Sequence, residues 1–201
     1  MSAERPSSRV TTLPNLLGLA RIAATPVVVA LLLLPFPGAG LISFAVFVGA
    51  AFTDYLDGRI ARARGQVTPL GVFMDLTADK VLVAGVLIAM VEVDLLPTWI
   101  VATLLIRELL VQGVRQLAAS ANVVIAARGW GKGKAVGVNA AIAVMLLAFD
   151  ARTGGPLAAT GFGPFIAAAG FWLAVAATAL AVVSAWGYLQ GAMPILLGRS
   201  R

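Results

Sequence analysis

The chain is dominated by long apolar stretches with few polar interruptions. A helix that crosses a hydrocarbon layer of about 30 Å needs about 20 mostly apolar residues. This pattern predicts six membrane spans: Leu13–Leu34, Leu41–Tyr55, Leu76–Val93, Leu96–Gln116, Val136–Phe149 and Phe162–Tyr188. The second and fifth runs are short, so we expect their helices to continue through polar residues on a protein-facing side. The predicted fold class is an all-α membrane protein with six transmembrane helices.

Composition supports this fold class. Hydrophobic residues make up 60% of the 201 residues and charged residues 12%, and the mean hydropathy is +0.96. A soluble domain has about 25% charged residues, so this chain has too few charges to cover a soluble surface. We interpret residues 1–201 as one membrane domain that begins with a short polar tail over residues 1–10. Cysteine and histidine are absent, so any bound metal must take oxygen ligands.

The distribution of charge predicts the topology. The predicted loops on one side of the membrane, together with both ends of the chain, carry most of the basic residues. The loops on the other side carry Glu92, Asp94, Asp150 and a single arginine, Arg152. Cytoplasmic loops are enriched in Lys and Arg, so both termini are predicted to be cytoplasmic. The net charge of +6 is then explained by topology and anionic headgroups. Nucleic-acid binding is not expected, because no suitable fold or aromatic platform is present.

An unusual cluster of acidic residues lies between residues 54 and 79. On helices, Asp54 and Asp57 share one face, and Asp75 and Asp79 share another. Like charges on one face repel, and a carboxylate within a membrane is costly, so we expect cations to neutralise them. Carboxylate oxygens suit Mg²⁺, Mn²⁺ or Ca²⁺. The alternative is a solvated charged face combined with helix packing through small residues.

The spacing Asp54-x2-Asp57-Gly58-x2-Ala61-Arg62-x8-Gly71-x3-Asp75-x3-Asp79 resembles the signature of the CDP-alcohol phosphatidyltransferases. The resemblance implies a membrane enzyme that displaces CMP from a CDP-linked lipid with an alcohol. It also implies that the four aspartates surround one or two Mg²⁺ or Mn²⁺ ions and that Asp79 is the catalytic general base. The remaining motif residues, Gly58, Ala61, Arg62 and Gly71, are expected to bind the nucleotide.

A second polar set lies on the same predicted side. Arg107-Glu108 and Arg115 lie in the fourth span, and a basic, glycine-rich loop covers residues 126–134. With Asn15, Arg21 and Ala78-Asp79-Lys80, this set resembles one branch of the family, the bacterial phosphatidylglycerophosphate synthases. That branch implies transfer from CDP-diacylglycerol to sn-glycerol 3-phosphate, with phosphatidylglycerol phosphate and CMP as products. Residues expected to bind the acceptor phosphate are Arg107, Arg115, Arg128, Lys132 and Lys134, although the loop is equally explained as a topological anchor.

Several alternatives remain open at this level. CDP-dependent cardiolipin synthases, whose acceptor is phosphatidylglycerol, are similar at the N-terminus and at Ala78-Asp79-Lys80. A divalent-cation transporter is disfavoured, because the carboxylates lie at one membrane edge and no inverted repeat is visible. Asn15 can contact the nucleotide or cap the first span. Small-residue runs such as Ala174–Ala181 fit close helix packing or a homodimer interface. We expect a multi-pass protein of the bacterial cytoplasmic membrane, in contact with membrane lipids, whose active site faces the cytoplasm.

Overall fold

The computed structural model describes residues 13–64, 69–120 and 130–196, and every regular element in these ranges is a helix. The elements are α1 (Leu13–Leu33), α2 (Ala39–Arg64), α3 (Pro69–Glu92), α4 (Thr98–Ser120), α5 (Trp130–Arg152), the 3₁₀ helix η1 (Pro156–Thr160) and α6 (Gly163–Leu196). The all-helical prediction is confirmed. Helices α2 and α5 do continue past the short apolar runs, to Arg64 at one end and from Trp130 at the other.

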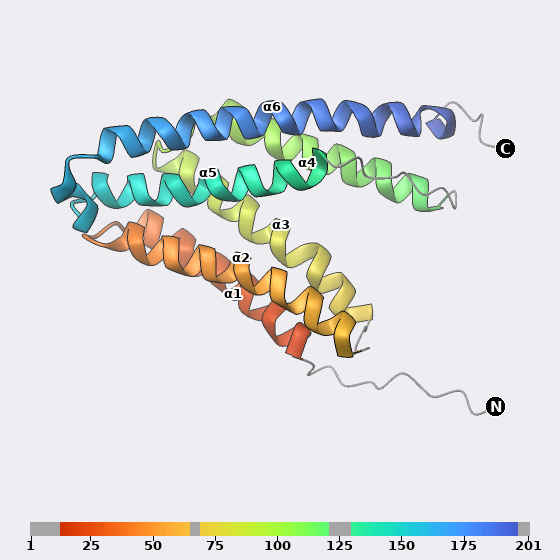
Figure 1. Cartoon of the computed structure of the whole chain (residues 1–201), viewed down its shortest axis with the longest axis horizontal. Coiled ribbons are helices and arrows are strands. Elements are labelled where there is room, and N and C mark those ends of the chain that lie inside the picture. The colour runs from red at the N-terminus through yellow and green to blue at the C-terminus, as the bar shows by residue number, and fades with distance from the viewer. Residues whose placement is uncertain (1–12, 65–68, 121–129, 197–201) are drawn as a thin grey trace.

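The helices form two three-helix units. In the first unit α1 packs against both α2 and α3, and in the second α6 packs against both α4 and α5. Helices α2 and α5 join the units, whereas α3 has only sparse contacts with α4 and α5. Figure 1 shows α3 running obliquely to α5, and it shows the start of α1 and the end of α6 at the same end of the molecule. The helices α3, α4 and α5 therefore meet in a loosely packed junction.

Small residues allow the helices within each unit to approach closely. On α6 the inward positions are Ala174, Ala177 and Ala181, all nearly inaccessible to solvent. On α3, a Cβ atom added to Gly85 would lie 2.5 Å from Thr25 Cγ2 of α1, so only glycine fits this contact without a shift. Close packing of this kind stabilises helix association in membranes, where no hydrophobic effect acts between helices. The small-residue run on α6 therefore has an intramolecular packing role.

The outer surface and the helix lengths are those of a multi-pass membrane protein. Within the part of the chain that the structure describes, three segments are long and apolar enough to cross a membrane by length and composition: Leu16–Leu33, Gly133–Arg152 and Gly163–Met193. Large apolar side chains point outward from the bundle, among them Ile106, Leu109, Trp172 and Trp186, each more than half exposed. Water would not favour such a surface, but lipid chains would cover it.

The end of the molecule that holds η1 is fastened by two charged residues of α5. Asp150 is fully buried, and its carboxylate accepts hydrogen bonds from the backbone N–H groups of Leu41, at 3.3 Å, and Leu157, at 3.0 Å. Both donors lie in the first turn of a helix, where backbone N–H groups lack intrahelical partners. Arg152 donates to the carbonyl oxygens of Val93 and Asp94 just beyond α3. The sequence assigned these charges only to a side of the membrane; the structure gives them a structural role.

Candidate active site

A cavity of about 330 Å³ lies where α3, α4 and α5 meet. Its volume is in the range typical of small-molecule sites. Polar side chains approach it from all three helices near the end that carries the acidic motif, and apolar side chains continue the wall further along the helices. The lining residues are Asp79, Lys80, Val83, Ala84, Leu87, Leu104, Leu105, Glu108, Leu109, Gln112, Lys134, Ala135, Val138 and Asn139. A polar substrate group and an apolar one can thus both find suitable partners here.

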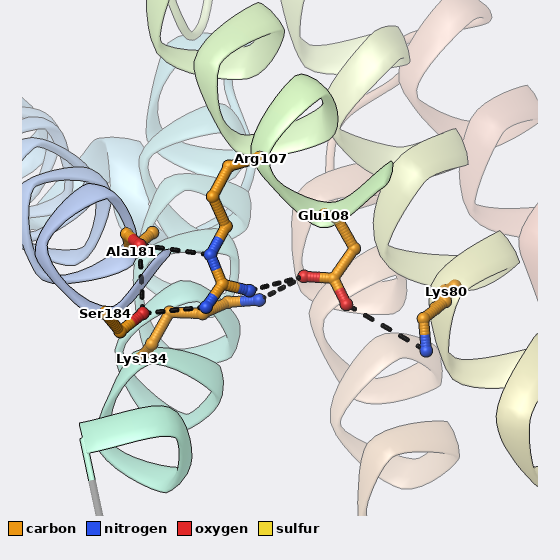
Figure 2. A network of polar contacts seen from close by, with 6 residues as sticks. All are labelled: Lys80, Arg107, Glu108, Lys134, Ala181 and Ser184. Carbon is orange, nitrogen blue, oxygen red and sulfur yellow. Dashed lines mark hydrogen bonds and ion pairs between the residues drawn. The ribbon is translucent and has the colours of Figure 1, made fainter. Parts of the chain in front are cut away.

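The carboxylate of Glu108 is the centre of the polar part of the cavity. Lys134 Nζ of α5 lies 2.5 Å from Glu108 Oε2, and Lys80 Nζ of α3 lies 3.9 Å from Oε1. Arg107 Nη1, from the neighbouring position on α4, lies 3.1 Å from Oε2. Figure 2 shows Glu108 between these three cations, which come from three different helices. One carboxylate therefore ties together the three helices that otherwise pack sparsely.

Arg107 is directed toward α6 and does not line the cavity. Its side chain is only 8% exposed. Its Nε donates to the Ala181 carbonyl oxygen at 3.0 Å, and its Nη2 donates to Ser184 Oγ at 2.7 Å (Figure 2). A buried guanidinium requires partners for its donors, and α6 and Glu108 provide them. Sequence reasoning identified Arg107 but could not find Ser184, since nothing in the α6 sequence marks it as an arginine partner.

Asp79, the predicted base, lies on the cavity wall and is surrounded by charge. It interacts electrostatically with Lys80, Glu108 and Lys134 and with Arg21 of α1. Arg21 is 1% exposed, and its Nε donates to the Ala50 carbonyl oxygen of α2 at 3.2 Å, one helical turn before Asp54. The buried arginine thus connects α1 with the helix segment that leads into the acidic motif. Asp79, the expected proton acceptor, and Lys134, one of the residues expected to bind the acceptor phosphate, thus line the same cavity.

The remaining motif residues are located by the backbone only. Asp54, Asp57, Gly58, Ala61 and Arg62 lie in the last part of α2, and Gly71 and Asp75 lie in the first part of α3. Figure 1 shows these two helix ends at the same end of the molecule. The structure does not describe their side chains, nor those of Asn15 and Lys132. Arg128 lies outside the described residues. Among the described side chains, no three acidic residues gather around a common point. Convergence of the four aspartates stays a prediction.

The basic segment before the fifth span differs from the sequence interpretation. It was expected to be a loop up to Lys134, but α5 begins at Trp130, so Lys132 and Lys134 belong to the first helical turns. Glycines at 131 and 133 each disfavour a helix by about 1 kcal/mol relative to alanine, but the segment is helical from Trp130 onward. Arg115 lies exposed on α4 and is not among the residues that line the cavity. Of the five residues expected to bind the acceptor phosphate, the cavity wall contains Lys134.

Comparison with known proteins agrees with this arrangement. The family model "CDP-alcohol phosphatidyltransferase" matches residues 11–186. The chain is 37% identical over 190 residues to the CDP-diacylglycerol–glycerol-3-phosphate 3-phosphatidyltransferase of Bacillus subtilis, covering 89% of this chain and 93% of that protein. It is 36% identical over 146 residues to a probable phosphatidylglycerophosphate synthase of Mycobacterium tuberculosis, covering 70% and 68% of the two chains. It is also 33% identical over 159 residues to a CMP-forming cardiolipin synthase of rice, covering 72% of this chain and 48% of that protein.

The all-helical bundle, the acidic motif, the charged cavity and these relatives together indicate a membrane-bound transferase of phospholipid biosynthesis. The chain belongs to the CDP-alcohol phosphatidyltransferase family. The relatives named above carry two different acceptor specificities, so family membership establishes the type of reaction and leaves the acceptor to be argued from the site.

Proposed function

We propose that the protein transfers the phosphatidyl group of CDP-diacylglycerol to sn-glycerol 3-phosphate, releasing CMP and forming phosphatidylglycerol phosphate. The observation that carries this proposal is the cavity between α3, α4 and α5. Its wall combines Asp79, the motif aspartate assigned as base, with Lys134 and Lys80 around Glu108. A small acceptor with a phosphate at one end and a hydroxyl at the other can reach both parts of such a site.

The acidic motif is proposed to hold the metal. Asp54, Asp57, Asp75 and Asp79 would bind one or two Mg²⁺ or Mn²⁺ ions, since a donor set made of carboxylates alone suits these hard cations. When bound, the ions would neutralise the pyrophosphate and the leaving CMP. Gly58, Ala61, Arg62, Gly71 and Asn15 are assigned to the nucleotide.

Asp79 is assigned the proton transfer. It accepts the proton of the sn-1 hydroxyl, whose oxygen forms a bond to the phosphorus of the phosphatidyl group. The bond from that phosphorus to the CMP oxygen breaks, and CMP leaves with the electron pair. Lys134 is assigned to the acceptor phosphate, which it can orient so that the hydroxyl faces Asp79. Arg115, Arg128 and Lys132 are assigned to the approach of the anionic acceptor.

Phosphatidylglycerol is the alternative acceptor, because a CMP-forming cardiolipin synthase is among the relatives. Its phosphate is a diester with one negative charge and carries two acyl chains. A cavity of about 330 Å³ that is lined by Lys80 and Lys134 is better suited to a small phosphomonoester. We therefore favour glycerol 3-phosphate.

The membrane placement follows from the same arrangement. We propose that all six α-helices cross the bacterial cytoplasmic membrane, with both termini and the polar end of the cavity at the cytoplasmic face. The clustering of Lys and Arg near that end supports this orientation. Water-soluble glycerol 3-phosphate would reach the polar end directly, while CDP-diacylglycerol and the surrounding membrane lipids occupy the bilayer beside it. A homodimer is proposed on the family resemblance.

The test is CMP release by purified protein in detergent or vesicles with CDP-diacylglycerol and Mg²⁺ or Mn²⁺. Glycerol 3-phosphate, glycerol and phosphatidylglycerol are compared as acceptors. We expect release with glycerol 3-phosphate and at least about 100-fold less with glycerol, since each charge-assisted contact to the phosphate contributes about 1.5–3 kcal/mol. Release with phosphatidylglycerol alone would overturn the acceptor assignment. Asp79→Asn should lower turnover by about 100-fold or more, because it removes general-base catalysis; retained turnover would refute the assigned base.

A further inference from the structure

We propose that Glu108 is a positioning residue for the acceptor site: it fixes the ammonium group of Lys134 at the cavity, close to Lys80, and Arg107 fixes Glu108 to α6. This proposal rests on the proposed function. It assigns Arg107 an indirect role, since its guanidinium faces α6 and not the cavity (Figure 2). Glu108 acts on the acceptor through the two lysines.

The first step of the argument is the rigidity of the anchor. Arg107 makes hydrogen bonds to a backbone carbonyl and to a hydroxyl group of α6, and it is nearly inaccessible to solvent. The hydroxyl of Ser184 also donates to the Ala181 carbonyl oxygen at 2.9 Å, so its orientation is determined from both sides. A planar guanidinium held at Nε and Nη2 has little freedom left, and Nη1 therefore presents a fixed donor to Glu108.

The second step is the position of the lysines. A lysine has a long, flexible stem, and ordering it costs up to about 2 kcal/mol of rotamer entropy. Lys134 Nζ is already fixed by Glu108, in a side chain that is only 16% exposed. An ammonium group has three donors. Among the described contacts, Lys134 makes one hydrogen bond, to Glu108, so two of its N–H groups can bind oxygen atoms of a ligand. Because the fold already orders Lys134, an acceptor phosphate can bind it with little further loss of rotamer entropy.

The third step is charge. Three cations, Lys80, Arg107 and Lys134, and two carboxylates, Glu108 and the neighbouring Asp79, give a formal sum of 3 − 2 = +1. Without Glu108 the three cations would repel one another and two lysine heads would move apart. With Glu108 present they stay together, and the remaining positive charge attracts an anionic phosphate. The network thus favours an acceptor with a charged phosphate over a neutral alcohol.

Two variants and two matched controls test the role. Glu108→Gln removes the charge with little change of shape, and Glu92→Gln makes the same change at an exposed position, the last residue of α3. Ser184→Ala removes one anchor of Arg107. Ser120→Ala is its control, because Ser120 makes the same bond to the carbonyl three residues earlier, at 2.8 Å, but is exposed and lies at the end of α4. KM for each substrate, kcat and the apparent Tm are measured for all four variants.

For Glu108→Gln we expect KM for glycerol 3-phosphate to rise about tenfold, with KM for CDP-diacylglycerol within about twofold of wild type, because the loss falls on acceptor binding. Ser184→Ala should raise the acceptor KM about two- to fivefold, and neither control should change it. Glu108→Asp, which keeps the charge on a shorter stem, should recover part of the loss.

Three results would overturn the role of Glu108: an unchanged acceptor KM in Glu108→Gln, an equal rise in both KM values, or a fall in kcat alone. If Glu108→Gln does not fold, Ser184→Ala decides, and an unchanged acceptor KM in that variant overturns the role. Failure of the proposed function gives a different result, because the wild-type protein itself would then release no CMP with glycerol 3-phosphate.

Discussion

Replacing Asp150 by asparagine should destabilise the protein without damaging the active site. Asp150 lies at the end of α5 remote from the cavity, and its two carboxylate oxygens each accept one backbone N–H, from α2 and from η1. It is fully buried. A Cβ atom added to Gly40 or to Gly155 would overlap it, which shows how tightly the surrounding backbone encloses this side chain. The substituted side chain therefore cannot turn away to find other partners.

The magnitude follows from the two hydrogen bonds. Asparagine keeps one acceptor oxygen, but its NH₂ group would face the other N–H donor. The variant loses one bond to a charged group and leaves a backbone N–H buried without an acceptor, a combined loss of about 2–4 kcal/mol. For a protein of this length, each kcal/mol corresponds to about 2–4 °C, so the apparent Tm should fall by about 5–15 °C. For Asp150→Ala the apparent Tm should fall by about 15 °C or more, because both N–H donors lose their acceptor.

The assay is thermal unfolding of detergent-purified protein at a fixed scan rate, with turnover measured at a temperature where the variant is folded. Asp94→Asn is the matched control: Asp94 is exposed, and its φ of 53° is a conformation that asparagine adopts readily. It should keep the wild-type Tm. A Tm for Asp150→Asn within 2 °C of this control would refute the reasoning, as would a selective loss of turnover in folded protein.

Two further predictions concern helix packing and metal. Gly85→Ala should lower the apparent Tm by a few degrees, since overpacking costs about 1–3 kcal/mol. Adding Thr25→Ser should restore the Tm, because it removes the Cγ2 atom that the new methyl group meets. A double variant as unstable as Gly85→Ala would contradict this explanation. Excess EDTA should abolish CMP release and Mg²⁺ or Mn²⁺ should restore it, while unchanged turnover in EDTA would contradict a metal role for the four aspartates.

The helices could be predicted from sequence more fully than the site. The first predicted span, Leu13–Leu34, and the first helix, Leu13–Leu33, agree closely, because a mostly apolar run of this length favours a helix in a membrane. Helix α5 begins at Trp130, earlier than the sequence predicts, because the glycines at 131 and 133 favour a loop when the segment is considered alone. The four aspartates could be recognised by their spacing alone. Their convergence depends on side chains outside the described residues.

The partners of charged residues were the least predictable part. Arg107 was marked as unusual because an arginine within an apolar span is costly, but its partner Ser184 lies 77 positions later on α6. Asp150 was interpreted as a charge on one side of the membrane, whereas it binds two backbone donors from segments that are distant in sequence. Spacing rules describe one helix at a time, and these contacts depend on how different helices pack.

The contacts of the bundle explain why its charges gather at the cavity. Close packing through alanine and glycine holds α1 against α3 and α6 against α5, but the same packing cannot operate where α3, α4 and α5 stay apart. At that place the network of Glu108, Lys80 and Lys134 connects the helices through long side chains. A polar network can span a gap that small residues would close, and it leaves the gap available to a ligand. Replacing the network by well-packed apolar residues could preserve stability, but it would remove the cations on which we expect acceptor binding to depend.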